Sequence, residues 1–174
     1  MAAPPGTHGP THDRTPGPAP GPAPGPAPGP TLVLSIQNRI EDLAAGMDAA
    51  EAFLAASAVG PDDHAQVMVI LDEVASNIIK GAWPQGGEHS FQVELRIGPA
   101  AAARELVLLA VDDGVEFDPT AAAPPDLGLD LDEREPGGLG LFMVSMMCDG
   151  LEYRRVGAQN RLTVTKRLQE PTPP

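Results

Sequence analysis

The feature that most constrains the fold is a stretch of strict alternation at residues 91–97. Its sequence, FQVELRI, places an apolar side chain at every second position and a polar one between each pair. Successive side chains of a β-strand point to opposite faces of the sheet, so this pattern predicts a strand with one buried face. A second layer of structure must cover that face. We therefore expect a sheet packed against another layer.

The neighbouring segments predict the rest of the sheet and its cover. Residues 106–111 form a nearly continuous apolar run that suits a central strand. Three more strands are expected at residues 32–36, 151–155 and 161–168, the last two joined by a turn at residues 157–160. Helices are expected over residues 37–58, from Asp62 or Asp63 to about residue 80, and over residues 139–148. This order lacks the regular alternation of a doubly wound sheet, so we expect an α/β (α+β) two-layer sandwich with helices on one face of a mixed β-sheet.

Proline and glycine divide the chain into unequal parts. Of the 21 prolines, 11 fall within residues 1–30, where no large apolar residue follows the initial methionine. Such a segment cannot bury enough apolar surface to offset the entropy lost on ordering. We therefore expect a disordered Pro/Gly/Ala-rich tail at residues 1–31, one domain at residues 32–169 and a short Pro-rich end at residues 170–174.

The charge and the apolar content oppose several classes of protein. The chain has 24 acidic and 11 basic residues, a formal net charge of −13, whereas a nucleic-acid binder presents a basic surface. Its start lacks the basic region and apolar run of a signal peptide, and its apolar stretches fall far short of the ~20 residues of a membrane span. We expect a cytoplasmic protein that contacts neither nucleic acid nor membrane.

Three groups of residues could carry chemistry, and the first lies on the second expected helix. Glu73 and Asn77 are four residues apart, with Lys80 three further on, so the three share a helix face. They could supply a general base, an oxygen ligand for Mg²⁺ and a phosphate contact. The same spacing also describes the solvated side of an ordinary amphipathic helix.

The other two groups lie at a strand end and at a helix start. Asp112 follows the apolar run and could accept a hydrogen bond from a ligand amino group, while Gly114 would allow close backbone approach; the alternative is a plain turn. Gly138 and Gly140 enter the last helix, where free backbone N–H groups could hold a phosphate; the alternative is simple helix entry. The intervening loop, residues 119–136, is long enough to act as a lid.

Taken in order, the three groups carry a family resemblance. Residues 71–80 (LDEVASNIIK), 111–119 (VDDGVEFDP) and 137–141 (GGLGL) resemble the N box, G1 box and G2 box of the GHKL ATPases. That superfamily includes gyrase, heat-shock chaperones, histidine kinases and mismatch-repair proteins. The Phe-Asp-Pro and Gly-Leu-Gly-Leu segments, with the closing NRLTVTK, look most like the bacterial anti-sigma regulatory factors. These are serine/threonine kinases with a histidine kinase-like ATPase domain. The similarity covers roughly residues 32–168.

The resemblance implies a GHKL (Bergerat) ATP-binding fold, with ATP and Mg²⁺ as cofactors. Asn77 would bind Mg²⁺, Glu73 would act as the base on the acceptor hydroxyl, and Asp112 would hold the adenine amino group. The nucleotide-binding set it implies is Asn77, Lys80, Asp112, Gly114, Gly138 and Gly140. Two departures stand out, because Gly81 replaces a frequent His or aromatic residue and Glu116 replaces the second glycine of the G1 box.

The resemblance also implies partners. A member of this branch binds a sigma factor and phosphorylates an anti-anti-sigma protein of the STAS type, and many members form homodimers. An alternative is a nucleotide-dependent module that binds its partner in a sigma-factor or phosphatase system without kinase activity. Replacement of Glu73 by Gln discriminates between the two readings, since it should abolish phosphotransfer and spare ATP binding.

Overall fold

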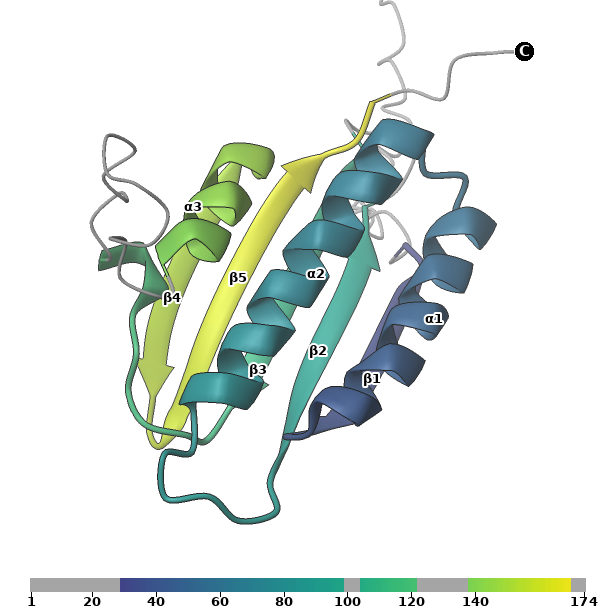
Figure 1. Ribbon diagram of the computed structural model, residues 1–174. Helices are drawn as coiled ribbons and strands as arrows, with labels where there is room; N and C mark the ends of the chain where they lie inside the picture. The colour runs from purple at the N-terminus through teal and green to yellow at the C-terminus, as the bar shows by residue number, and fades with distance from the viewer. Residues whose placement is uncertain (1–28, 99–103, 122–137, 170–174) are drawn as a thin grey trace, which may run out of the picture.

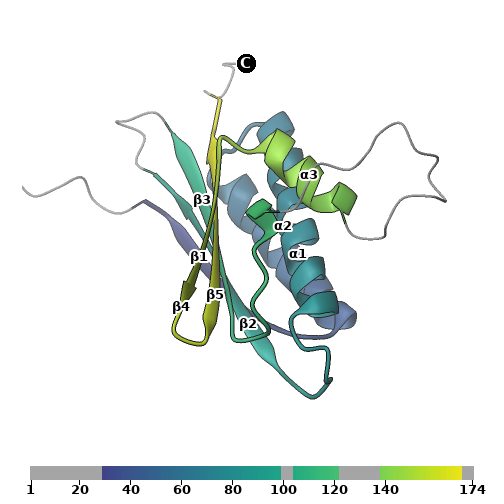
Figure 2. The same cartoon turned by 90° about the vertical axis from the view of Figure 1, so that its left-hand side faces the viewer.

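The computed structural model describes residues 29–98, 104–121 and 138–169, and these form a sheet with helices on one of its faces (Figure 1). Turned by 90°, the sheet and the helices stand as two separate layers (Figure 2). The elements are β1 (Thr31–Gln37), α1 (Ile40–Ala56), α2 (Pro61–Gly81), β2 (Ser90–Ile97), β3 (Glu105–Asp112), the 3-10 helix η1 (Pro119–Ala121), α3 (Gly138–Met147), β4 (Gly150–Val156) and β5 (Gln159–Arg167). The expected tail up to residue 28, most of the lid-like loop and the Pro-rich end lie outside the described residues.

The two-layer architecture is confirmed, but the sheet is antiparallel rather than mixed. Its order is β1-β2-β3-β5-β4, and every pairing within it is antiparallel. Two helices between β1 and β2 return the chain to the end where β1 stopped, so β2 runs back along β1. The segment that ends with α3 carries the chain to the opposite end, so β4 runs parallel to β3. Because β5 lies between those two strands, they never pair.

The core lies between the sheet and the layer of helices, as the alternation predicted. On β2 the apolar residues at 91, 93, 95 and 97 are all buried, and every second residue of β3 is buried as well. The helix α2 presents to them the residues Val67, Ile70, Leu71 and Val74, none more than 2 % exposed. In the described part of the chain, no helix combines the length and apolar character that crossing a membrane requires.

The helix α2 begins differently from the prediction that Asp62 or Asp63 caps it. Its N-cap is Gly60, and Pro61 occupies the first turn, where the ring fixes a helical φ and no N–H donor is lost. Asp63 is buried instead, because its carboxylate forms an ion pair with Lys166 of β5 (3.4 Å) and accepts a hydrogen bond from the Gln169 N–H (2.6 Å).

Candidate functional site

Glu73, the predicted base, lies against the start of α3. Its side chain is half-buried on α2, and a Cβ added at Gly140 would overlap its carboxylate, Oε2 most closely. Only glycine therefore leaves room for the carboxylate in this position. The first N–H groups of a helix have no intrahelical acceptor and carry partial positive charge. The structure thus places a carboxylate next to a helix end that suits an anion.

Asn77 lies one turn further along α2, with its amide oriented by the helix itself. Its Nδ2 donates to the backbone oxygen of Glu73 (2.7 Å), so Oδ1 is the end that can act as a ligand. Mg²⁺ prefers oxygen donors and in nucleotide sites takes one or two from the protein, the rest coming from phosphates and water. Asn77 fits that role. Lys80 is exposed in the last turn of α2.

Asp112 ends β3 with its carboxylate held from one side. The residue is 7 % exposed, and its Oδ1 accepts from the Gly114 N–H (2.9 Å) and from Asn160 Nδ2 (2.8 Å). Within the described residues Oδ2 makes no hydrogen bond. Asp112 can therefore accept one from an amino group of a ligand.

Gly114 joins the Asp112 segment to the end of α2. A Cβ at Gly114 would overlap the backbone oxygen of Ala82, and the Val115 N–H donates to that same oxygen (2.8 Å). Glu73 and Ala82 are nine residues apart, which corresponds to about 13 Å along a helix axis. The predicted residues therefore follow α2 from the glycine of α3 at one end to Asp112 and Gly114 at the other.

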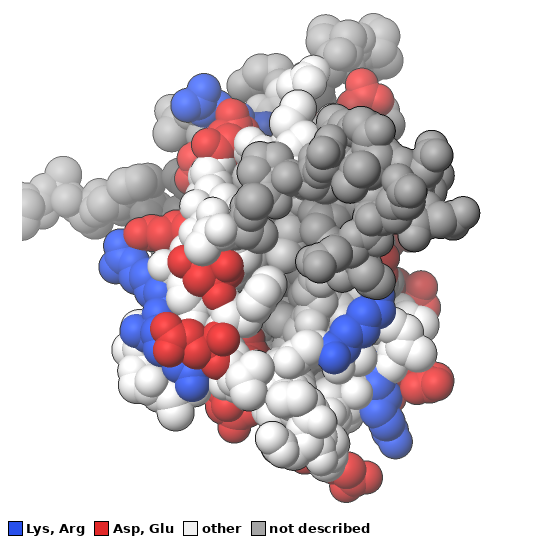
Figure 3. Space-filling model, turned by 60° about the vertical axis from the view of Figure 1, so that its left-hand side comes forward, with Lys and Arg blue, Asp and Glu red and all other residues white. Residues whose placement is uncertain are grey.

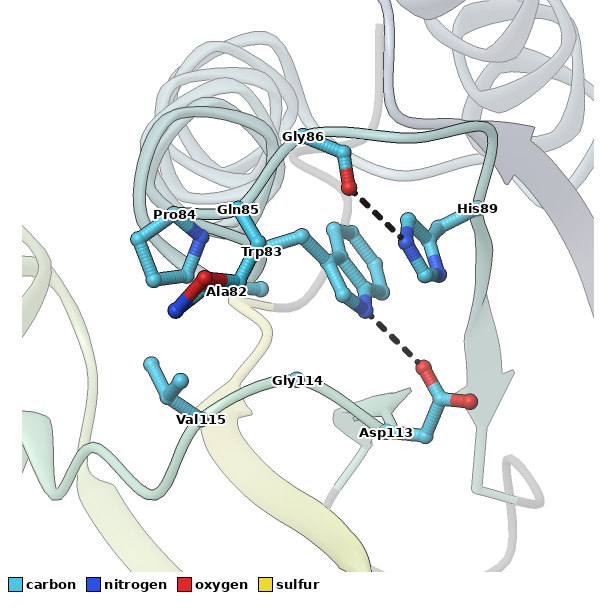
Figure 4. A pocket seen from close by; sticks show the side chains of 9 residues that line it. All are labelled: Ala82, Trp83, Pro84, Gln85, Gly86, His89, Asp113, Gly114 and Val115. Carbon is cyan, nitrogen blue, oxygen red and sulfur yellow. Dashed lines mark hydrogen bonds between the residues drawn. The ribbon is translucent and has the colours of Figure 1, made fainter.

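A cavity of 380 Å³ adjoins the Asp112 end of this line (Figure 4). Trp83 forms a wall of it, donating from Nε1 to Asp113 Oδ1 (3.1 Å) and stacking on the ring of His89 with centroids 4.8 Å apart. Gly114 borders the cavity, whereas Asp112, Glu73 and Asn77 do not line it. The aromatic wall was not predicted, because Trp83 and His89 are six residues apart in an irregular segment whose path no periodic pattern indicates.

Asn160 is the main site residue that the sequence analysis missed. It was expected in a turn, but the turn is confined to residues 157–158 and Asn160 belongs to β5, directly opposite Asp112. It shares a buried face with Leu162 and Val164. An amide at the end of that alternating series was the available signal.

Charged side chains are mixed on the face that Figure 3 shows. Acidic and basic groups lie interspersed at the left of that view, over the edge of the outer sheet face, and the described residues form no continuous basic patch there.

The chain is similar to a kinase and matches one domain family over most of its length. The serine/threonine-protein kinase BtrW of Bordetella bronchiseptica is 35% identical over 94 residues, which cover 54% of this chain and 63% of that protein. The match thus spans less than two thirds of the relative's length. The profile of the histidine kinase-like ATPase domain matches residues 36–166, from β1 to β5. Together with the two-layer fold and the three sequence boxes that lie along α2, this match shows that the chain belongs to the histidine kinase-like (GHKL) ATPase domain family.

Proposed function

We propose that the chain binds Mg-ATP and acts as a cytoplasmic anti-sigma regulatory factor that phosphorylates a serine or threonine of an anti-anti-sigma (STAS-type) protein. A sigma factor is the competing partner. The contact between Glu73 and Gly140 carries the proposal, because it sets a proton acceptor beside the helix start suited to phosphate. The family supports ATP as the donor, and the name of the relative supports a hydroxyl acceptor.

The candidate site residues on and beside α2 have distinct roles in this reaction. Asp112 holds the adenine amino group. Asn77 Oδ1 would hold Mg²⁺, which when bound would neutralise charge on the phosphate oxygens. The acceptor hydroxyl gives its proton to the Glu73 carboxylate as its oxygen bonds to the γ-phosphorus. The bond from that phosphorus to the bridging oxygen breaks, and the electron pair stays on ADP. The N–H groups at the start of α3 and the Lys80 ammonium stabilise the charge on the phosphates.

Replacing Glu73 by Gln tests the base. We expect phosphotransfer to a candidate anti-anti-sigma protein to fall by about 10²- to 10⁴-fold, the usual contribution of a general base. Binding of Mg-ATP, measured by calorimetry, should persist. Asp72→Asn is the matched control, because Asp72 is exposed on the same helix. Undiminished transfer by the Glu73 variant would contradict the assigned role. ATP binding by a wild type that transfers nothing would favour the partner-binding module without kinase activity.

Replacing Asp112 by Asn tests the nucleotide site. An amide at this position offers a weaker, uncharged acceptor, so Mg-ATP affinity should fall while circular dichroism shows an unchanged fold. If the wild type itself does not bind Mg-ATP, the proposed function is wrong.

A further inference from the structure

We propose that Arg155 and Tyr153 are positioning residues that act through Asn160 on the Asp112 carboxylate. By fixing that carboxylate as a hydrogen-bond acceptor, they make the site select purine nucleotides with a 6-amino group over those with a 6-oxo group. The inference rests on the proposed nucleotide site and adds the residues that set its base selectivity.

The amide of Asn160 makes four hydrogen bonds, the full number available to it. Nδ2 donates to Asp112 Oδ1 (2.8 Å) and to the backbone oxygen of Val115 (2.8 Å). Oδ1 accepts from the Tyr153 hydroxyl (2.8 Å) and from the Arg155 guanidinium (2.6 Å). Asn160 is 6 % exposed, so water has little access to replace any of these partners.

These partners leave the amide one orientation. A carboxylate and a backbone carbonyl only accept, and a guanidinium only donates. Turning the amide by 180° would set its NH₂ against Arg155 and its oxygen against Asp112, which breaks the bonds on both sides. Partial burial and the nearby Glu116 carboxylate raise the pKa of Tyr153, which keeps its hydroxyl protonated. Tyr153 alone could not enforce the amide orientation, because a protonated hydroxyl can both donate and accept. Of the two partners of Oδ1, Arg155 is therefore the one that fixes the polarity of the amide.

The fixed amide in turn fixes Asp112. Its Oδ1 is occupied by two N–H donors, from Asn160 and Gly114, and Arg155 also donates to the backbone oxygen of Gly114 (3.0 Å). The carboxylate plane is thereby held, and within the described residues Oδ2 is the oxygen left free to accept a hydrogen bond. A 6-amino group donates to it, whereas a 6-oxo group would bring a lone pair against a negative charge. Selectivity then comes from repulsion of the wrong base as well as attraction of the right one.

The arrangement depends on strand register, which also provides a control. Arg155 of β4 pairs directly with Asn160 of β5, so its side chain lies on the inner face of the sheet beside the amide. The neighbouring Arg154 points to the outer face and bonds to the exposed Glu152. Two adjacent arginines on one strand thus differ only in the face they occupy.

Calorimetry with Mg-ATP and Mg-ITP, which differ in the 6-amino and 6-oxo groups, tests the proposal. Arg155→Met should weaken ATP binding by about tenfold or more, as for the loss of a hydrogen bond to a charged acceptor, and leave the weaker ITP binding nearly unchanged. Arg155→Gln introduces a polar side chain that can accept as well as donate, so it should also lower the ratio of ATP affinity to ITP affinity. Arg155→Lys introduces a side chain that only donates, so it should keep much of the wild-type affinity ratio. Arg154→Met should leave that ratio unchanged.

The outcomes separate this proposal from the proposed function. An equal loss of ATP and ITP affinity in the Arg155 variants would indicate a merely structural role and overturn the inference. An unchanged ratio would overturn it as well. If Arg155→Met does not fold, Arg155→Gln and Arg155→Lys still decide between these results. A wild type that binds neither nucleotide would instead contradict the nucleotide site itself.

Discussion

Two glycines of the site differ in what an added methyl group would meet. At Gly140 the obstructing atoms belong to the end of the Glu73 side chain, which can rotate away. At Gly114 they are the backbone oxygen and Cβ of Ala82, which cannot move without shifting the end of α2. The same substitution at the two positions should therefore separate function from stability.

For Gly140→Ala we expect a loss of phosphotransfer with no loss of stability. The methyl group displaces the Glu73 carboxylate from the start of α3, while alanine favours a helix over glycine by up to about 1 kcal/mol. Urea unfolding measures the stability of the variant, and an assay of phosphotransfer measures its activity. Gly60→Ala is the control, because a Cβ there meets nothing within 4 Å. A variant with full transfer would show that the contact has no catalytic meaning.

Gly114→Ala should instead destabilise the protein. Forcing a methyl group into a packed site costs about 1–3 kcal/mol, and here it would separate Ala82 from the segment that follows Asp112. Urea unfolding should show the lower stability, and calorimetry a weaker affinity for Mg-ATP. Wild-type stability in this variant would mean that the approach of Gly114 to Ala82 is not tight.

At the scale of the elements, a buried ammonium joins α2, α3 and β5. Lys166 Nζ lies near three acceptors: Gln66 Oε1 (2.7 Å), the Met147 backbone oxygen (3.2 Å) and Asp63 Oδ1 (3.4 Å). An ammonium has three N–H donors, so all can be used. The cation lies at the C-terminus of α3 and the carboxylate in the first turn of α2, each where the helix dipole favours it.

Lys166→Met should lower the free energy of unfolding by about 3–5 kcal/mol, since it leaves a buried carboxylate unpaired. Adding Asp63→Asn to that variant should restore part of the loss, because the second change removes the uncompensated charge. Urea unfolding measures both. Arg167→Met is the control, as its ion pair with Asp149 is long (4.0 Å) and exposed and should contribute less than about 1 kcal/mol. A double variant no more stable than Lys166→Met would contradict the pairing.

The sequence predicted these elements well and their long-range partners poorly. Strands and helices came from periodicity, which the chain carries locally, and the pattern at residues 91–97 appears as β2 (Ser90–Ile97). The pairing of Asp63 with Lys166 and that of Asp112 with Asn160 depend on strand order and register, which no local pattern encodes. The sequence analysis accordingly assigned Asp63 to a helix cap and Asn160 to a turn, whereas Asp63 pairs with Lys166 and Asn160 with Asp112. The roles of Glu73, Asn77, Lys80 and the glycines remain predictions that the proposed variants address.

At the scale of the whole molecule, the fold needs the chain from Pro30 onward. The Pro30 oxygen accepts from the Ile97 N–H (3.0 Å), and β1 pairs with β2 along its full length. β1 also supplies Leu34 and Ile36 to the core. The composition of residues 1–28 predicts a tether without chemistry.

Deleting residues 1–28 should leave both unfolding free energy and phosphotransfer unchanged. Deleting residues 1–37 should destabilise the protein strongly, because β2 loses a partner strand and the core loses two buried side chains. Circular dichroism and urea unfolding distinguish the two variants. A loss of transfer in the shorter deletion, with stability retained, would overturn the view of the tail as a tether.

The strand β5 carries Asn160 near its start and Lys166 near its end, about 20 Å apart along the strand. Asn160 holds Asp112 at the base end of the proposed site, and Lys166 anchors the far end of α3. A slip of β5 against β3 would therefore misplace both at once. In evolutionary terms the two ends are not independent traits, so selection for a new nucleotide preference must preserve the register that also anchors α3.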